Sequence, residues 1–69
     1  MSSATLAAGH YMMVLRARRE PIFYHRRGDA DEPWVPIEGH AAKARTAALL
    51  GMKGWQRQGF NQFVLEVIT

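Results

Sequence analysis

The residues best suited to chemistry are five arginines that crowd into twelve positions of the chain, with aromatic rings between them. From position 16 to position 27 the charge is +4, while all other positions together carry −1. A guanidinium group donates two parallel hydrogen bonds to a phosphate, and aromatic rings stack on bases. This segment therefore has the chemistry of a site for single-stranded nucleic acid. A solvated hairpin that keeps a small protein soluble accounts for the same residues, because no recognised RNA-binding signature accompanies them. The segment holds Arg16, Arg18, Arg19, Phe23, Tyr24, His25, Arg26 and Arg27.

Three histidines, His10, His25 and His40, lie fifteen residues apart and raise the question of a metal site. The hairpin expected for this region places His25 across from Val14 and away from His10. Cysteine is absent, and no two histidines have the i, i+4 spacing of a helical metal site. We therefore expect no metal and no other cofactor.

Carboxylates that could work as an acid and base pair follow position 28, and few hydroxyl nucleophiles accompany them. Asp31 and Glu32 lie in an expected turn, and Glu38 comes six residues after Glu32 in the chain. We expect no concave pocket beside this turn that could hold a substrate. No motif places a base beside a hydroxyl, and phosphate loops, zinc-protease helices and nucleophile elbows are absent. The sequence therefore predicts a protein that is not an enzyme. Tyrosines aside, the hydroxyl groups belong to Ser2, Ser3, Thr5, Thr46 and Thr69.

The length and composition of the chain limit the size of the domain that must position these residues. A chain of 69 residues has room for one thin core, and without cysteine no disulfide can reinforce it. Its hydrophobic content of 48% argues against disorder. We expect a flexible tail over residues 1–9 and a single small domain over residues 10–69. No apolar run approaches the roughly 20 residues that cross a bilayer, and no cationic leader precedes the N-terminal alanines, so we expect a cytoplasmic protein with no membrane partner.

Two strands joined by a turn are expected over residues 10–18 and 21–27, because apolar residues alternate in the first and β-formers fill the second. The expected register places Ala17 opposite Ile22. A one-residue change of this register would exchange the two sides of the second strand. The expected core side holds Tyr11, Met13, Leu15, Ala17, Ile22 and Tyr24, and the outward side holds Met12, Val14, Arg16, Arg18, Phe23, His25 and Arg27.

The remaining elements are a short edge strand, a helix and a closing strand. Two prolines limit residues 33–37 to an edge position. Residues 40–50 have a helical composition, and four alanines form a stripe expected to pack on the sheet, so Ala44→Leu should overpack that contact. Residues 55–59 are expected to be a polar loop, and residues 63–68 a strand that is apolar on both sides. The stripe holds Ala41, Ala44, Ala47 and Ala48, and the inward side of the last strand holds Phe63, Leu65 and Val67.

These elements predict an α/β fold of the α+β type, a single two-layer sandwich with one helix packed on a three- to four-stranded sheet. The order along the chain is β-β-β-α-β. A right-handed crossover through the helix would bring the last strand in parallel to the first, which gives the sheet order 3-2-1-4.

One helix covers only one face of such a sheet, so apolar side chains on the other face have no expected cover. An apolar patch with a charged rim is typical of a protein interface or of a homodimer surface. The alternative is that the N-terminal tail folds over this face. Two tryptophans in expected loops, Trp34 and Trp55, are further anchor candidates, because tryptophan and arginine dominate interface hot spots. The outward set holds Met12, Val14, Phe23, Val64 and Ile68, with Arg16, Arg27 and Glu66 beside them.

Two functions remain. In the first, the protein is an inhibitor or adaptor that occupies a surface on a protein or ribonucleoprotein partner; in the second, it binds nucleic acid directly through the arginine hairpin. The outward apolar residues favour the first, because a nucleic-acid groove is not expected to carry them together. The candidate partner-binding residues are Val14, Arg16, Arg18, Arg19, Phe23, Arg26, Arg27, Trp34, Trp55 and Ile68.

In size, in its build of one helix and a sheet, in its lack of catalytic residues and in its polarised charge, the chain resembles the small phage-encoded inhibitors of bacterial defence, particularly the anti-CRISPR proteins. Arginine outnumbers lysine seven to two and alanine occurs ten times, a bias associated with GC-rich bacterial and phage genomes. The resemblance is one of type, without a shared motif, so it assigns no residue. It implies an inhibitor that blocks a subunit of a CRISPR surveillance complex inside a bacterial host cell.

Overall fold

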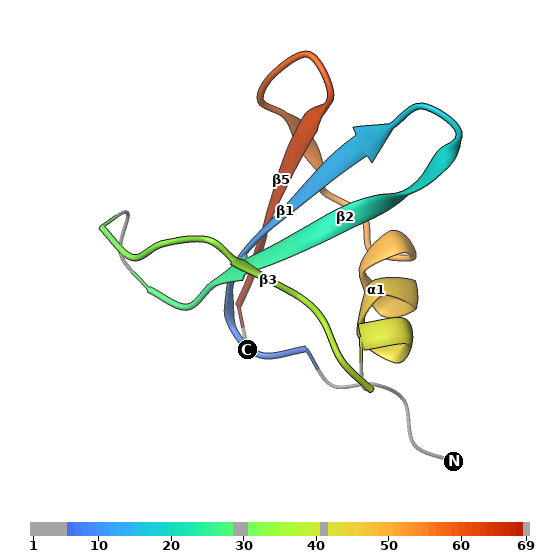
Figure 1. The fold of residues 1–69 in the computed structure, drawn as a ribbon. Coiled ribbons are helices and arrows are strands. Elements are labelled where there is room, and N and C mark those ends of the chain that lie inside the picture. Colours follow the sequence, from blue (N-terminus) through green and yellow to red (C-terminus); the bar gives the residue numbers. More distant parts are fainter. Residues whose placement is uncertain (1–5, 29–30, 41, 69) are drawn as a thin grey trace.

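Five antiparallel strands form one twisted sheet with a single short helix beside it in the computed structural model, which describes residues 6–28, 31–40 and 42–68 (Figure 1). The strands lie in the order β3-β2-β1-β5-β4, and every neighbouring pair is antiparallel. Within the described ranges, no helix has the length and apolar character needed to cross a bilayer. The elements are β1 (Gly9–Arg16), β2 (Arg19–Arg26), β3 (Val35–Pro36), α1 (Ala42–Leu50), β4 (Gln56–Arg57) and β5 (Gln62–Val67).

The expected α/β sandwich, with a three- to four-stranded sheet in the chain order β-β-β-α-β, is wrong. The stretch expected to be a polar loop contains β4, which turns back and pairs with β5. The first strand after the helix is therefore β4, and it runs in the same direction as β1. The β4–β5 hairpin then reverses the chain and places β5 between β1 and β4, so β5 is antiparallel to β1 where a parallel strand was expected.

The core lies between α1 and one face of the sheet. Tyr11 and Leu49 are completely buried, and Phe23 keeps only 3% of its surface exposed. The burial of Leu65 and Val67 confirms the inward side expected for these two residues of the last strand. The buried cluster is Leu6, Tyr11, Phe23, Leu49, Leu65 and Val67, and Met13, Ile37, Ala48 and Trp55 pack against it.

The register of the β1–β2 hairpin differs by three positions from the expected one. Val14 lies opposite Ile22, because two residues rather than four close the turn and the ladder shifts just before it. An odd shift exchanges the two sides of a strand. Phe23 therefore faces the core, and Ile22 and Tyr24 face outward, the reverse of the expected arrangement.

The helix faces the sheet with Leu49 and not with the alanine stripe. Ala44 and Ala47 are exposed and Ala48 is half-buried, while Ala41 lies outside the described residues. The expected stripe is wrong for Ala44 and Ala47, because burying one leucine removes far more apolar area from water than burying an alanine. The indole Nε1 of Trp55 donates a hydrogen bond to the Leu49 carbonyl at 3.0 Å, which satisfies an acceptor in the last turn of the helix.

Residues 6–8 run along the core side of the sheet. Leu6 belongs to the buried cluster, and the Tyr11 hydroxyl donates to the Ala7 carbonyl at 2.7 Å. The expected flexible tail covers residues 1–9, of which 1–5 lie outside the described residues.

Candidate functional site

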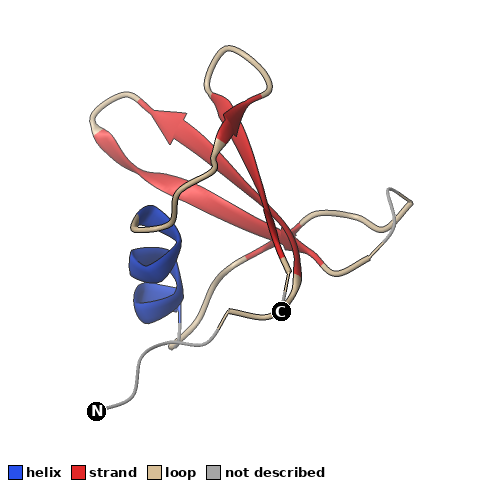
Figure 2. Cartoon of the chain, turned by 180° about the vertical axis from the view of Figure 1, so that it is seen from behind, coloured by secondary structure: helices blue, strands red, loops and turns tan. Residues whose placement is uncertain are grey.

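An apolar surface covers the middle of the sheet on the side away from α1. Met12 lies opposite Tyr24 on β2 and opposite Val64 on β5, and Val14 lies opposite Ile22, so the five side chains share one face. All five are half-buried. The helix packs on the other face, and within the described chain no helix or strand lies over this one (Figure 2). We call Met12, Val14, Ile22, Tyr24 and Val64 the open face.

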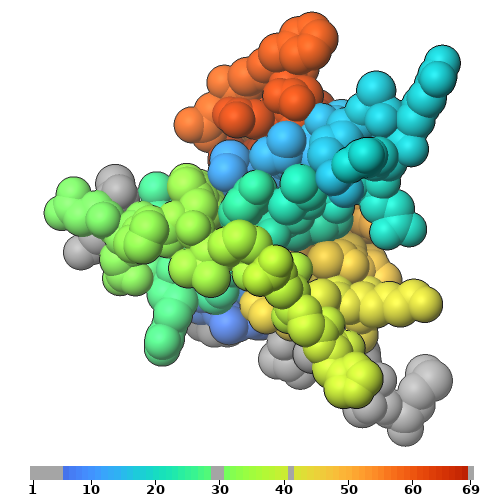
Figure 3. Space-filling view, viewed as in Figure 1, coloured from blue at the N-terminus to red at the C-terminus, as the bar shows by residue number. Residues whose placement is uncertain are grey.

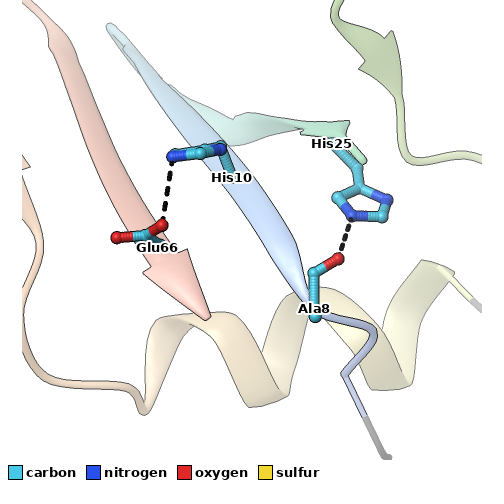
Figure 4. A network of polar contacts seen from close by, with 4 residues as sticks. All are labelled: Ala8, His10, His25 and Glu66. Carbon is cyan, nitrogen blue, oxygen red and sulfur yellow. Dashed lines mark hydrogen bonds and ion pairs between the residues drawn. The ribbon is translucent and has the colours of Figure 1, made fainter. Parts of the chain in front are cut away.

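A row of polar residues borders the open face at the end away from the β1–β2 turn. His10 lies opposite Arg26 on one side and opposite Glu66 on the other, with its Nε2 3.5 Å from Glu66 Oε2 (Figure 4). The Arg26 guanidinium carbon lies 4.4 Å from the centroid of the Trp34 ring. Among the described residues, His10 Nδ1 and Arg26 Nε are buried and have no hydrogen-bond partner. Arg26 is therefore engaged with a ring and its neighbours and does not extend into solvent as a free cation.

The three arginines at the β1–β2 turn border the opposite end of the open face. Arg16 donates to the Glu20 carbonyl through Nε at 2.9 Å and through Nη2 at 2.6 Å, so its guanidinium closes the turn. Arg18, at φ 59°, and Arg19 are exposed. Arg26 lies seven residues from Arg19 along β2, roughly 23 Å away in an extended strand. The basic segment is thus divided into two separate groups.

The aromatic residues of the same segment do not form a platform on which bases can stack. Phe23 lies in the core, and its ring is 6.2 Å from that of Trp55. The His25 ring stacks on Tyr11 on the core side, with centroids 4.4 Å apart and planes 9° from parallel. Only Tyr24 faces outward, in the open face. The segment therefore lacks the alternation of free cations and free rings that binding of single strands requires.

The other candidate partner-binding residues lie in different surroundings. Ile68 follows the last residue of β5 and is 82% exposed. Arg27 is exposed beyond the end of β2. Trp55 packs against the core, and Trp34 lies under Arg26. Of the candidate set, the structure places Val14 in the open face, with Arg16, Arg18 and Arg19 at its border.

Phe60, at the β4–β5 turn, is an exposed aromatic that sequence reasoning missed. Its side chain is 90% exposed, although the turn is held in place. Arg57 donates through Nε to the Gly59 carbonyl and through Nη2 to the Phe60 carbonyl, and the Asn61 amide donates to the Leu15 carbonyl. The sequence feature that could have predicted this exposure is the position of Phe60 directly between Gly59 and Asn61, two residue types that favour turns.

The carboxylates and hydroxyls considered for catalysis do not come together in the described chain. Asp31, Glu32 and Glu38 are all exposed, and Thr46 donates its hydroxyl to the Lys43 carbonyl at 3.2 Å. Ser2, Ser3, Thr5 and Thr69 lie outside the described residues. His10 and His25 point to opposite faces of the sheet, and the described residues contain no group of three metal-ligating side chains that could hold an ion.

Comparison with protein-family models, with curated proteins and with solved structures finds no match to this chain. The functional argument therefore rests on the residues themselves.

Proposed function

We propose that the protein works by binding another protein through the open face, and that it thereby blocks or adapts a macromolecular complex. The observation that carries this proposal is the run of apolar side chains across three neighbouring strands with no helix or strand of the described chain above them. Apolar patches of this kind with polar rims are typical of interfaces. Leu6, on the core side, supports the proposal, because residues 6–8 do not turn toward the open face.

The border of the open face defines the chemistry of the partner. One end carries Arg16, Arg18 and Arg19, and the chain as a whole has a net charge of +3. A partner that complements it has an apolar patch with carboxylates beside it, because complementary charge speeds association and fixes the orientation of the complex. Direct binding of nucleic acid has less support, since Arg16 and Arg26 are engaged within the protein and Phe23 is buried.

The specific partner that we propose is a subunit of a bacterial CRISPR surveillance complex, as for the anti-CRISPR inhibitors that the chain resembles in type. Such an inhibitor needs no catalytic group. It acts by covering the surface on which the complex binds guide RNA or target DNA.

A plaque assay tests this partner. A phage that the host's CRISPR system targets should form plaques when the host expresses the wild-type chain and should fail to do so when it expresses Val14→Asp. Ala44→Asp is the matched control, because it adds the same charge at an exposed position of α1, away from the open face. Wild-type protein that leaves plaque numbers unchanged against each CRISPR type assayed would remove the CRISPR complex as the partner.

A photo-crosslinking experiment tests the face independently of that partner. A benzophenone amino acid replaces Gln62, which is exposed and lies opposite Val14, or replaces Ala44 on the helix. The Gln62 variant should give a specific protein adduct that Val14→Asp abolishes, because a charge in a desolvated patch costs about 2 kcal/mol or more. Equal adducts from both positions would place the contact elsewhere.

A further inference from the structure

A cleft of about 230 Å³ lies on the core side of the sheet, between the end of β2, the segment 31–37 and the first turns of α1. His25 and Arg27 line it from β2 and the residue after it, and Arg45 lines it from the helix. Figure 3 shows the segment 31–40, in green to yellow-green, running down toward the helix, in yellow. We call this space the β2–α1 cleft. It is separate from the open face, because His25 faces the core side.

The positive groups of the β2–α1 cleft have no carboxylate partner in the described chain. Arg45 is half-buried and Arg27 is exposed, yet the single ion pair among the described residues joins His10 to Glu66. Glu32 also lines the cleft. Its carboxylate lies against the backbone of Gly28, where a Cβ would be 2.6 Å from Glu32 Oε1, and it is not within 4 Å of either arginine. Two guanidinium groups therefore border one small space, and among the described residues neither lies within 4 Å of a carboxylate, although Glu32 lines the same space.

The walls of the cleft are apolar. They are formed by Pro33, Val35, Pro36 and Ile37, of which Ile37 packs against the core. The Ile37 amide donates to the Phe23 carbonyl at 2.9 Å, so the wall is fixed to β2. An apolar cavity of about 150 Å³ can hold a benzene ring. The β2–α1 cleft therefore has room for one ring or a short chain together with an anionic head.

We propose that the β2–α1 cleft is a binding site for a small organic anion, with a carboxylate or phosphate head held by Arg27 and Arg45 and an apolar body held against residues 33–37. Guanidinium groups bind both kinds of head in bidentate geometry. The proposal does not depend on the proposed function, because the open face lies on the other side of the sheet.

Titration of the ¹⁵N-labelled protein tests the site, with phenyl phosphate and benzoate as the two probes. The amide signals of Arg27, Val35, Ile37 and Arg45 should shift and saturate. The probe that binds more tightly identifies the preferred head. Inorganic phosphate and benzyl alcohol, which each lack one half of the probe, should bind at least about tenfold more weakly, because each loses one set of contacts.

Two variants with equal loss of charge provide the control. Arg45→Gln should weaken binding of phenyl phosphate about tenfold, the effect expected for one charge-assisted contact. Lys43→Gln, on the same helix but outside the cleft, should leave the affinity unchanged. Arg27→Gln, at an exposed position, repeats the test if Arg45→Gln unfolds. Equal weakening by Lys43→Gln, or shifts that do not saturate and centre on the β1–β2 turn, would overturn the site.

Discussion

The guanidinium of Arg26 lies over the ring of Trp34, with 4.4 Å between the guanidinium carbon and the ring centroid. This contact joins the last residue of β2 to the loop before β3, and it borders the open face. A double-mutant cycle with Arg26→Gln and Trp34→Leu should give an interaction energy of about 0.5 to 1 kcal/mol in urea unfolding, the range for a partly exposed cation–π pair. Additive single effects would show that the two side chains do not stabilise each other.

The core depends on Leu49 more than on any alanine of α1. Leu49→Ala should lower the free energy of unfolding by about 2 to 5 kcal/mol, because a completely buried side chain leaves a cavity. Ala44→Leu, at an exposed position, should change it by less than about 0.5 kcal/mol. Denaturant unfolding of both variants checks the orientation of the helix, and the reverse order of effects would contradict it.

Gly9 begins β1 at φ 137° in a position that a side chain cannot occupy without strain. A Cβ there would lie 2.7 Å from the Arg26 carbonyl oxygen and 2.9 Å from His25 Nε2. Gly9→Ala should therefore lower the free energy of unfolding by more than about 2 kcal/mol. Gly39→Ala is the control, since φ is 91° there but no atom lies within 4 Å, and its cost should be about 1 kcal/mol. Thermal unfolding of the two variants should separate them clearly.

Binding of nucleic acid should be weak and should show a shallow salt dependence. Arg18 and Arg19 are exposed together at the turn, Arg27 is exposed at the far end of β2 and too distant to join them, and Arg16 and Arg26 are engaged within the protein. The slope of log K against log salt should therefore be about −2, not the −4 to −5 expected if all five arginines met phosphates, with dissociation constants of about 10⁻⁴ to 10⁻⁶ M near 0.15 M salt. A gel shift over a salt series measures both quantities. A submicromolar complex that survives Val14→Asp would favour the nucleic-acid function over the open face.

The local pattern of this sequence predicts where strands and helix lie, but not how they pair. The alternation of apolar residues along the sequence correctly predicted β1 and the inward side chains of Leu65 and Val67, because successive side chains of a strand point to opposite faces whatever the strand pairs with. The side of β2 depends on irregularities of the ladder as well as on the turn: a two-residue turn alone would leave Phe23 opposite Met12, on the outward side, and the one-residue register shift between Val14 and Arg16 places it opposite Met13, in the core. β4 was missed because two polar residues carry no strand signal of their own; Gln56 and Arg57 are extended only because β5 pairs with them.

The candidate site was predicted in part for the same reason. Val14 lies on the side of the sheet that alternation assigned to it, and Val64 joins the same side through pairing with Met12. The contacts of the arginine side chains could not be predicted from the charge pattern of the sequence. Arg16 turns onto a carbonyl four residues away, and Arg26 meets a ring eight positions later, contacts that only the folded turns create.

The position of β5 beside β1 has a consequence for folding kinetics. β1 is the central strand, and one of its two partners comes from residues about fifty positions further along the chain, where Gly9 meets Val67 and Val14 meets Gln62. The β1–β2 hairpin can form early as a local structure, but the sheet cannot close until β5 has left the ribosome. Such distant pairing raises the contact order and slows folding toward the millisecond to second range. Until β5 pairs, the hairpin exposes one edge of β1 and the apolar side chain of Phe23, and an unpaired strand edge beside exposed apolar surface is prone to associate with other chains.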